Sequence, residues 1–111
     1  MNLEIVKCTS HNFAIEITDP SGAPYAPRTG DVVIFGIQKR STREILIVKT
    51  AKVEPSGMVN ITFKPEDTKE LRPDRYFYDV GLKTGNDYYM IVPLSEIVIR
   101  ENVTDKEMAY V

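Results

Sequence analysis

Short runs in which apolar and polar residues alternate limit this chain's fold more than any other feature of its sequence. Residues 11–18 and 58–64 each place apolar side chains at every second position. Because successive side chains of a strand point to opposite faces, this spacing predicts strands with one buried face. Residues 31–38 are apolar on both faces, which predicts a central strand, and Gly36 within them predicts a bulge or a close backbone approach.

Turn-forming residues separate these runs at the intervals expected of a β-sandwich. Asp19-Pro20-Ser21-Gly22 is one such turn, and Pro55-Ser56-Gly57 is another. We expect strands over residues 3–7, 11–18, 31–38, 44–53, 58–64, 75–83, 88–92 and 95–100.

Residues 65–71 break the alternation. Pro65 followed by two acidic residues predicts one helical turn that crosses between two sheets. After it, Tyr76 or Tyr78 stands where immunoglobulin-like sandwiches often carry a tyrosine whose hydroxyl bonds the upstream backbone, with Leu71 as a buried anchor. The predicted fold is therefore all-β: an immunoglobulin-like β-sandwich of seven or eight antiparallel strands with one short helical crossing turn.

The length and composition favour one ordinary globular domain. The chain has 111 residues, of which 42% are hydrophobic and 27% charged. We expect a single β-sandwich domain over residues 1–100 and a flexible polar C-terminal tail over residues 101–111.

Charge, hydropathy and cysteine use exclude several classes of function. The net charge is -2 and no basic face stands out, so we expect no nucleic-acid partner. No apolar run approaches about 20 residues, and the first residues lack the pattern of a signal peptide, so we expect neither a signal peptide nor a membrane partner. The single Cys8 cannot close a disulfide within the chain, which favours assembly in a reducing cytosol.

Residues that carry out catalysis are scarce. His11 is the only histidine, and we interpret it as an exposed side chain at a strand end rather than a catalytic base. Cys8 lies three residues before it and is expected to be a small buried apolar residue, because a structural zinc site needs four ligands. Asp79 is expected to pair with a lysine or arginine on a neighbouring strand. We therefore predict no enzyme activity, no metal and no cofactor.

Aromatic and basic side chains supply the candidate binding surface. Strand alternation sends Phe77 to the face opposite Tyr76 and Tyr78, and it also separates Tyr88 from Tyr89. The polar loop over residues 39–43 contains two arginines. The possible partner-binding surface consists of Phe77, Tyr88, Arg40 and Arg43.

Four segments of the sequence, taken in order, form a recognisable combination. They are ITDPSGAPY at 17–25, GDVVIFGI at 30–37, KPEDT at 64–68 and YFYDVGL at 76–82. In this order they resemble small phage and prophage structural domains of tail and baseplate proteins, notably the N-terminal domain of upper baseplate proteins. The likeness covers roughly residues 11 to 100. It implies an immunoglobulin-like attachment module without catalytic residues.

The resemblance implies a non-enzymatic phage or prophage structural protein that acts through protein–protein contacts. It would be a tail or baseplate adaptor or a virion-associated interaction module, located in the virion and assembled in the bacterial cytoplasm. Its partners would be other phage structural proteins and further copies of itself. The alternative from the residues is a carbohydrate- or cell-surface-binding β-sandwich module that uses the outward aromatics near Phe77 and Tyr88.

Overall fold

The computed structural model describes residues 2–102, and these form an all-β structure. Its regular elements, in chain order, are β1 Leu3–Val6, β2 His11–Glu16, β3 Val32–Gln38, β4 Ile45–Ala51, β5 Met58–Phe63, the 3-10 turn η1 Pro65–Asp67, β6 Asp74–Thr84 and β7 Asp87–Arg100. No helix in the described part of the chain is long and apolar enough to cross a membrane.

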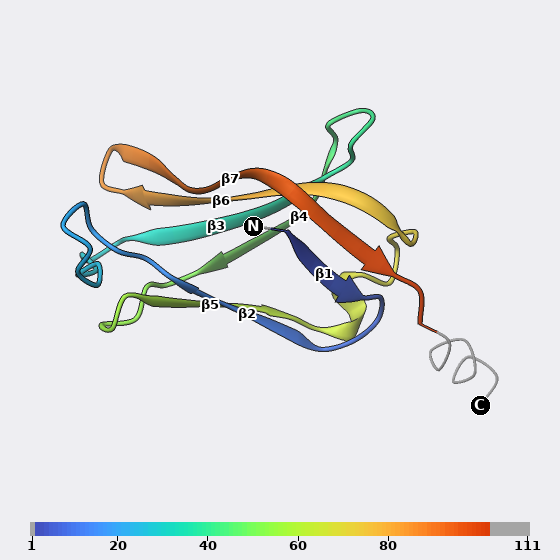
Figure 1. Ribbon diagram of the computed structural model, residues 1–111, viewed down its shortest axis with the longest axis horizontal. Helices are drawn as coiled ribbons and strands as arrows, with labels where there is room; N and C mark the ends of the chain where they lie inside the picture. The colour runs from blue at the N-terminus through green and yellow to red at the C-terminus, as the bar shows by residue number, and fades with distance from the viewer. Residues whose placement is uncertain (1, 103–111) are drawn as a thin grey trace.

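The strands lie in two sheets that face each other (Figure 1). The larger has five strands in the order β1-β7-β6-β3-β4, and the smaller pairs β2 with β5. The prediction that residues 31–38 form a central strand is confirmed, because β3 pairs with β4 on one side and β6 on the other.

The expectation of exclusively antiparallel strands is wrong at one place. β1 pairs with β7 in parallel, with Leu3 opposite Ile97 and Val6 opposite Arg100. No hairpin joins these two strands, since the chain leaves β1 for β2 in the other sheet. Their relative direction is therefore free of the constraint that a short turn imposes.

The separate strands expected at 88–92 and 95–100 are one continuous strand, β7. The ladder between β6 and β7 shifts register twice, between Tyr78 and Val80 and between Val80 and Gly81. Such bulges let the strand continue past Pro93, which lies within it. In β3 the expected irregularity falls one residue after Gly36, between Ile37 and Gln38 in the ladder with β4.

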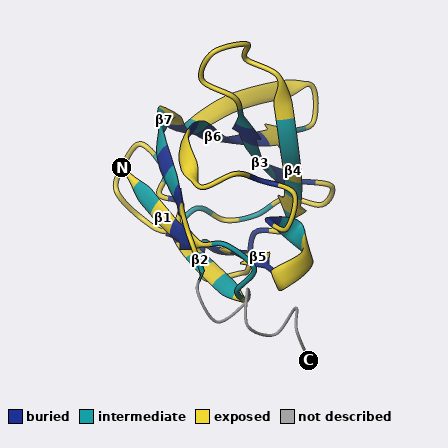
Figure 2. Ribbon diagram, turned by 90° about the vertical axis from the view of Figure 1, so that its right-hand side faces the viewer, coloured by how far each residue is buried: buried dark blue, intermediate teal, exposed yellow. Residues whose placement is uncertain are grey.

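The core fills the space between the two sheets, where the buried stretches of Figure 2 face one another. Phe35 lies at its centre, with ring centroids 5.3 Å from Tyr78, 5.6 Å from Phe63 and 6.0 Å from Phe13. These rings come from both sheets, so aromatic packing joins the two layers.

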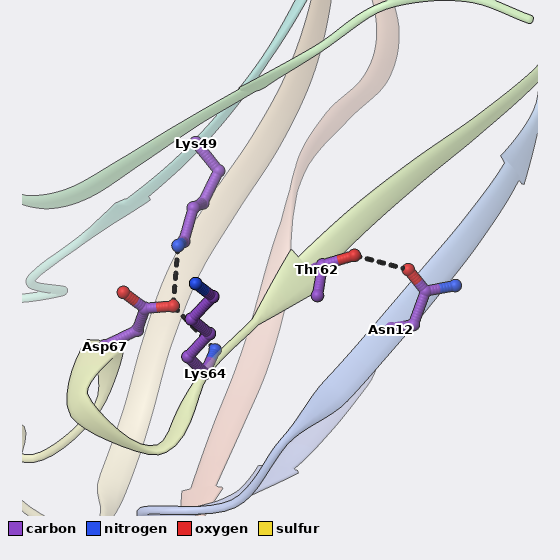
Figure 3. A network of polar contacts seen from close by, with 5 residues as sticks. All are labelled: Asn12, Lys49, Thr62, Lys64 and Asp67. Atoms are coloured by element: carbon purple, nitrogen blue, oxygen red, sulfur yellow. Dashed lines mark hydrogen bonds and ion pairs between the residues drawn. The ribbon is translucent and has the colours of Figure 1, made fainter.

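The predicted helical crossing is confirmed as the single 3-10 turn η1, which follows β5. Figure 3 shows how this turn is attached. The Asp67 carboxylate accepts the backbone N–H of Lys64 at 2.7 Å and forms an ion pair with the Lys49 ammonium at 2.6 Å. On the other side of the figure, the Thr62 hydroxyl donates to the Asn12 side chain across the β2–β5 pair, at 2.9 Å.

The predicted tyrosine contact is also confirmed, at Tyr76 rather than Tyr78. The Tyr76 hydroxyl donates to the backbone carbonyl of Arg72 at 2.7 Å, and Leu71 beside it is buried. This bond connects the chain segment before β6 to the strand itself.

The predicted polar tail is described only in its first two residues, and residues 103–111 lie outside the described part of the chain. Asn102, in that predicted tail, donates its side-chain amide to the backbone carbonyl of Lys7 at 3.0 Å.

Candidate functional site

The outward side of the five-stranded sheet, which faces away from β2 and β5 and is called here the outer face, carries several exposed apolar side chains. Ile45 and Val48 on β4 are 65% and 57% exposed, and Tyr88 and Leu94 on β7 are 53% and 46% exposed. Singly exposed apolar residues are common on proteins, but here four surround one depression, and gatherings of this kind mark interaction surfaces.

This depression, the outer groove, has a volume of about 210 Å³. Ile45, Val48, Tyr88 and Leu94 line it together with Gly36 and Asp79 from the two strands between β4 and β7. Gly36 and Asp79 are directly opposite each other in the β3–β6 ladder. Because Gly36 has no side chain, it forms part of the floor of the groove, and the side chains on β4 and β7 project past it on either side as rims.

Asp79 does not have the cross-strand cation that the sequence led us to expect. Its opposite residue on β3 is Gly36, and among the described residues no lysine or arginine forms an ion pair with it. Its side chain is partly buried, and one carboxylate oxygen lies 4.0 Å from the place where a Cβ of Gly36 would stand. The groove therefore combines apolar rims with an unpaired carboxylate.

Tyr88 is positioned by Gly81, its neighbour on β6. A Cβ at position 81 would overlap the Tyr88 hydroxyl, so the phenol ring occupies the space that any other side chain would need. The absence of a side chain at Gly81 thus sets where this rim of the outer groove lies.

Three of the four predicted surface residues come together at one end of the outer face. The guanidinium carbons of Arg43 and Arg40 lie 4.7 Å and 5.6 Å from the Phe77 ring centroid, in cation–π contacts. Arg43 also donates to the Gln38 side chain at 3.0 Å. Tyr88, the fourth residue, borders the groove on β7 and is separate from this group.

A cationic hollow of about 340 Å³ adjoins this end of the sheet. Lys39 and Arg40 of the β3–β4 loop line it with Arg72 and Arg75, and Asp74 is its single acidic residue. Arg75 is 3.7 Å from Glu96 in an ion pair. The sequence did not indicate this hollow, because the two groups of cations lie about thirty residues apart and only the fold brings them together.

Another hollow, of about 580 Å³, lies at the opposite end of the β6–β7 hairpin. Ile17, Leu82 and Ile91 form much of its apolar lining, and Arg28 and Asp87 are among its charged residues. This volume is in the range of small-molecule sites.

Behind this hollow, Asp31 holds the loop that precedes β3. Its carboxylate accepts the Tyr25 hydroxyl at 2.6 Å and the Arg28 backbone N–H at 2.9 Å. Burial alone would raise the pKa of Asp31, but the hydrogen bonds from Thr84, Tyr25 and Arg28 outweigh it and the pKa lies below 3.8. The strand predicted over residues 31–38 begins at Asp31, but the sequence pattern does not indicate that this carboxylate is buried.

Cys8 and His11 lie in different local structures, a turn and the start of β2. Cys8 is only partly buried, in a turn with φ of 60°, so the expectation of a buried apolar residue is wrong. Its backbone N–H donates to the Thr68 hydroxyl at 2.8 Å, which explains why the residue stays in this turn. His11 stands at the start of β2 as expected, but it is partly buried rather than exposed, because its ring packs on Phe13 with centroids 4.3 Å apart.

The described residues contain no group of three or more His, Cys, Asp and Glu side chains placed to hold a metal ion. The surfaces that the described part offers include the outer groove, the cationic hollow and the hollow by Asp31.

Comparison of the chain with models of known protein families gives no match, and comparison with curated proteins also finds no matching sequence.

Proposed function

We propose that this chain is a non-enzymatic structural protein of a phage or prophage particle, which attaches to neighbouring proteins through the outer face of its five-stranded sheet. The observation that carries the docking role is the gathering of exposed apolar side chains around the outer groove. The phage context rests on the resemblance of the four sequence segments described above, and it includes further copies of the chain among the partners.

An immunoglobulin-like sandwich is part of this proposal. Three features support it: the sheet order β1-β7-β6-β3-β4, the opposing β2–β5 pair, and the Tyr76 hydroxyl bond before β6. In such a sandwich the core holds the two sheets together, and an outward sheet face is left free to bind a partner.

The energetics favour docking at this face. Fully burying one exposed aliphatic or aromatic side chain contributes roughly 1.5–3 kcal/mol. Ile45, Val48, Tyr88 and Leu94 are 46–65% exposed, so a partner that covers them gains roughly half of such a contribution from each. Tyr88 fits the role of an anchor residue, because tyrosine is enriched among the residues that dominate interface energies.

The test is photo-crosslinking in cells that produce the particle. A photoreactive phenylalanine is placed at Val48, on the outer face, or at Ala14, an exposed position on β2 in the other sheet. We expect position 48 to cross-link to an identified structural protein of the particle, and position 14 to give no such product.

Equal cross-linking from both positions would contradict a specific docking face. Products that contain only cytoplasmic proteins unrelated to the particle would contradict the structural role.

Carbohydrate binding is the second candidate, and the exposed Tyr88 ring beside a groove that contains the Asp79 carboxylate favours it. Aromatic faces next to hydrogen-bonding groups suit sugar rings. Binding on a glycan array that disappears in the Tyr88→Ala variant would replace the first proposal with this one.

A further inference from the structure

We propose that the outer groove receives a lysine or arginine side chain of the docked partner, with its cationic group against Asp79. This inference rests on the proposed docking role of the outer face and specifies the chemistry of the partner. The partner is thus a protein segment that presents a basic residue flanked by apolar ones.

The first argument is the charge of the groove. Asp79 is partly buried on the sheet, and no cation among the described residues pairs with it. The nearby arginines of the β3–β4 loop, Arg40 and Arg43, instead lie over Phe77. Covering Asp79 with an apolar partner would leave a buried charge unpaired, which is unfavourable, whereas a partner's cation would neutralise it.

The second argument is the shape and lining of the groove. Lysine and arginine have aliphatic stems that pack on apolar surface while the charged end reaches a polar group. Val48 and Ile45 on one rim and Leu94 on the other provide that apolar surface. The Tyr88 ring adds an aromatic face, which attracts a cation beside it.

The third argument is size. At about 210 Å³ the groove is smaller than the 300–1,000 Å³ typical of sites for whole small molecules. A single long side chain suits it better. Gly36 provides part of this room, because a larger residue there would fill the groove floor opposite Asp79.

The experiment is an NMR titration in which the backbone amide signals of the full chain are followed. The three probes are single amino acids whose termini are blocked and uncharged: N-acetyl-arginine methylamide, N-acetyl-lysine methylamide with a free side-chain amine, and N-acetyl-norleucine methylamide. We expect the two cationic probes to shift the signals of Gly36, Val48, Asp79 and Tyr88. The neutral norleucine probe is expected to bind at least ten-fold more weakly.

The matched variants are Asp79→Asn, which removes the charge with little change of shape, and Asp87→Asn, which removes a charge at the far end of the hairpin. We expect a ten-fold or greater loss of cationic-probe affinity in Asp79→Asn and no change in Asp87→Asn. If Asp79→Asn does not fold, Val48→Ser, which removes part of the apolar rim, provides the second comparison and is expected to weaken all three probes.

Equal affinity of the norleucine and cationic probes for the unmodified chain would overturn the inference, as would shifts confined to residues away from the groove. Cross-links from position 48 without any preference for a cation would overturn only this inference and leave the docking face standing. Preference for a cation without cross-links from position 48 would instead overturn the docking role.

Discussion

The Tyr76 hydroxyl shows how one side-chain atom fixes the path of the chain between the two sheets. It donates to the Arg72 carbonyl four residues upstream, just where the chain leaves the crossing segment and enters β6. The ring is buried, so the bond is largely protected from competing water. A second polar anchor, Asp67, holds the crossing turn to Lys49 on β4.

We expect Tyr76→Phe to lower the free energy of unfolding by about 1 kcal/mol, because it removes one buried hydrogen bond and leaves the ring packing intact. Chemical denaturation monitored by circular dichroism measures this. Tyr88→Phe is the control, since that ring is half exposed, and its free energy of unfolding should change by less than about 0.5 kcal/mol. Equal losses in the two variants would contradict the role of the Tyr76 bond.

The lowered pKa of Asp67 predicts that the stability of the fold depends on pH. The hydrogen bond from Lys49, followed by that from the Lys64 backbone N–H, lowers the pKa of Asp67 below its ordinary 3.8. Since the folded pKa is the lower one, the carboxylate stabilises the fold above 3.8, and this contribution is lost as the pH falls through the folded pKa.

We therefore expect Asp67→Asn to be less stable than the unmodified chain in neutral buffer, with a difference that shrinks in acid. Denaturant titrations at neutral pH and at several values below 3.8 measure it. Part of the acid sensitivity remains in the variant, because the pKa values of Asp19 and Asp31 are also lowered. A stability difference that grows toward low pH would contradict the assignment.

At the scale of elements, β7 differs most from the usual pattern. Two register shifts against β6 allow it to run through Pro93 and to turn Tyr88 and Leu94 toward the groove. Gly81 on β6 makes room for Tyr88. The groove rim thus depends on a bulged strand and on a glycine in its neighbour.

Replacing Gly81 with alanine is expected to turn the Tyr88 ring away from β6 while the fold persists, because the atoms in conflict belong to the far end of that side chain. The free energy of unfolding should change by less than about 1 kcal/mol. Loss of nuclear Overhauser contacts between the Tyr88 ring and residue 81 measures the movement.

Gly36→Ala is the matched control, since the nearest atoms to a Cβ there are 4.0 Å away. It should leave the Tyr88 ring in place. An unmoved ring in Gly81→Ala would mean that the glycine does not determine the position of this rim.

The elements that sequence predicted well are those whose pattern is local. Alternation located β2 and β5 to within two residues, because each has one face in the core and one in water. The parallel partner of β1 and the continuity of β7 were missed, because both depend on residues distant in sequence or on a bulge that disrupts the alternation. The outer groove was missed for the same reason: Gly36, Asp79 and Tyr88 come from three strands.

At the scale of the whole molecule, the two sheets have different roles. β2 and β5 cover the inner side of the larger sheet and complete the core, whereas the outer face keeps its apolar side chains exposed. Of the four surface residues predicted from sequence, Phe77, Arg40 and Arg43 meet at one end of that sheet and Tyr88 borders the groove. Alternation predicted that Phe77 points outward, but the fold was needed to show which residues share its surroundings.

The proposal that the chain attaches to a phage or prophage particle through its outer face is tested most directly by the amount of the chain in purified particles. Quantitative mass spectrometry measures this amount for the unmodified protein, Val48→Glu and Ala14→Glu. Both substitutions place a carboxylate at an exposed strand position, one on the outer face and one on β2. We predict that the unmodified protein and Ala14→Glu are incorporated, and that Val48→Glu folds but is lost from particles. Incorporation of all three at equal levels, or of none, would contradict attachment through the outer face.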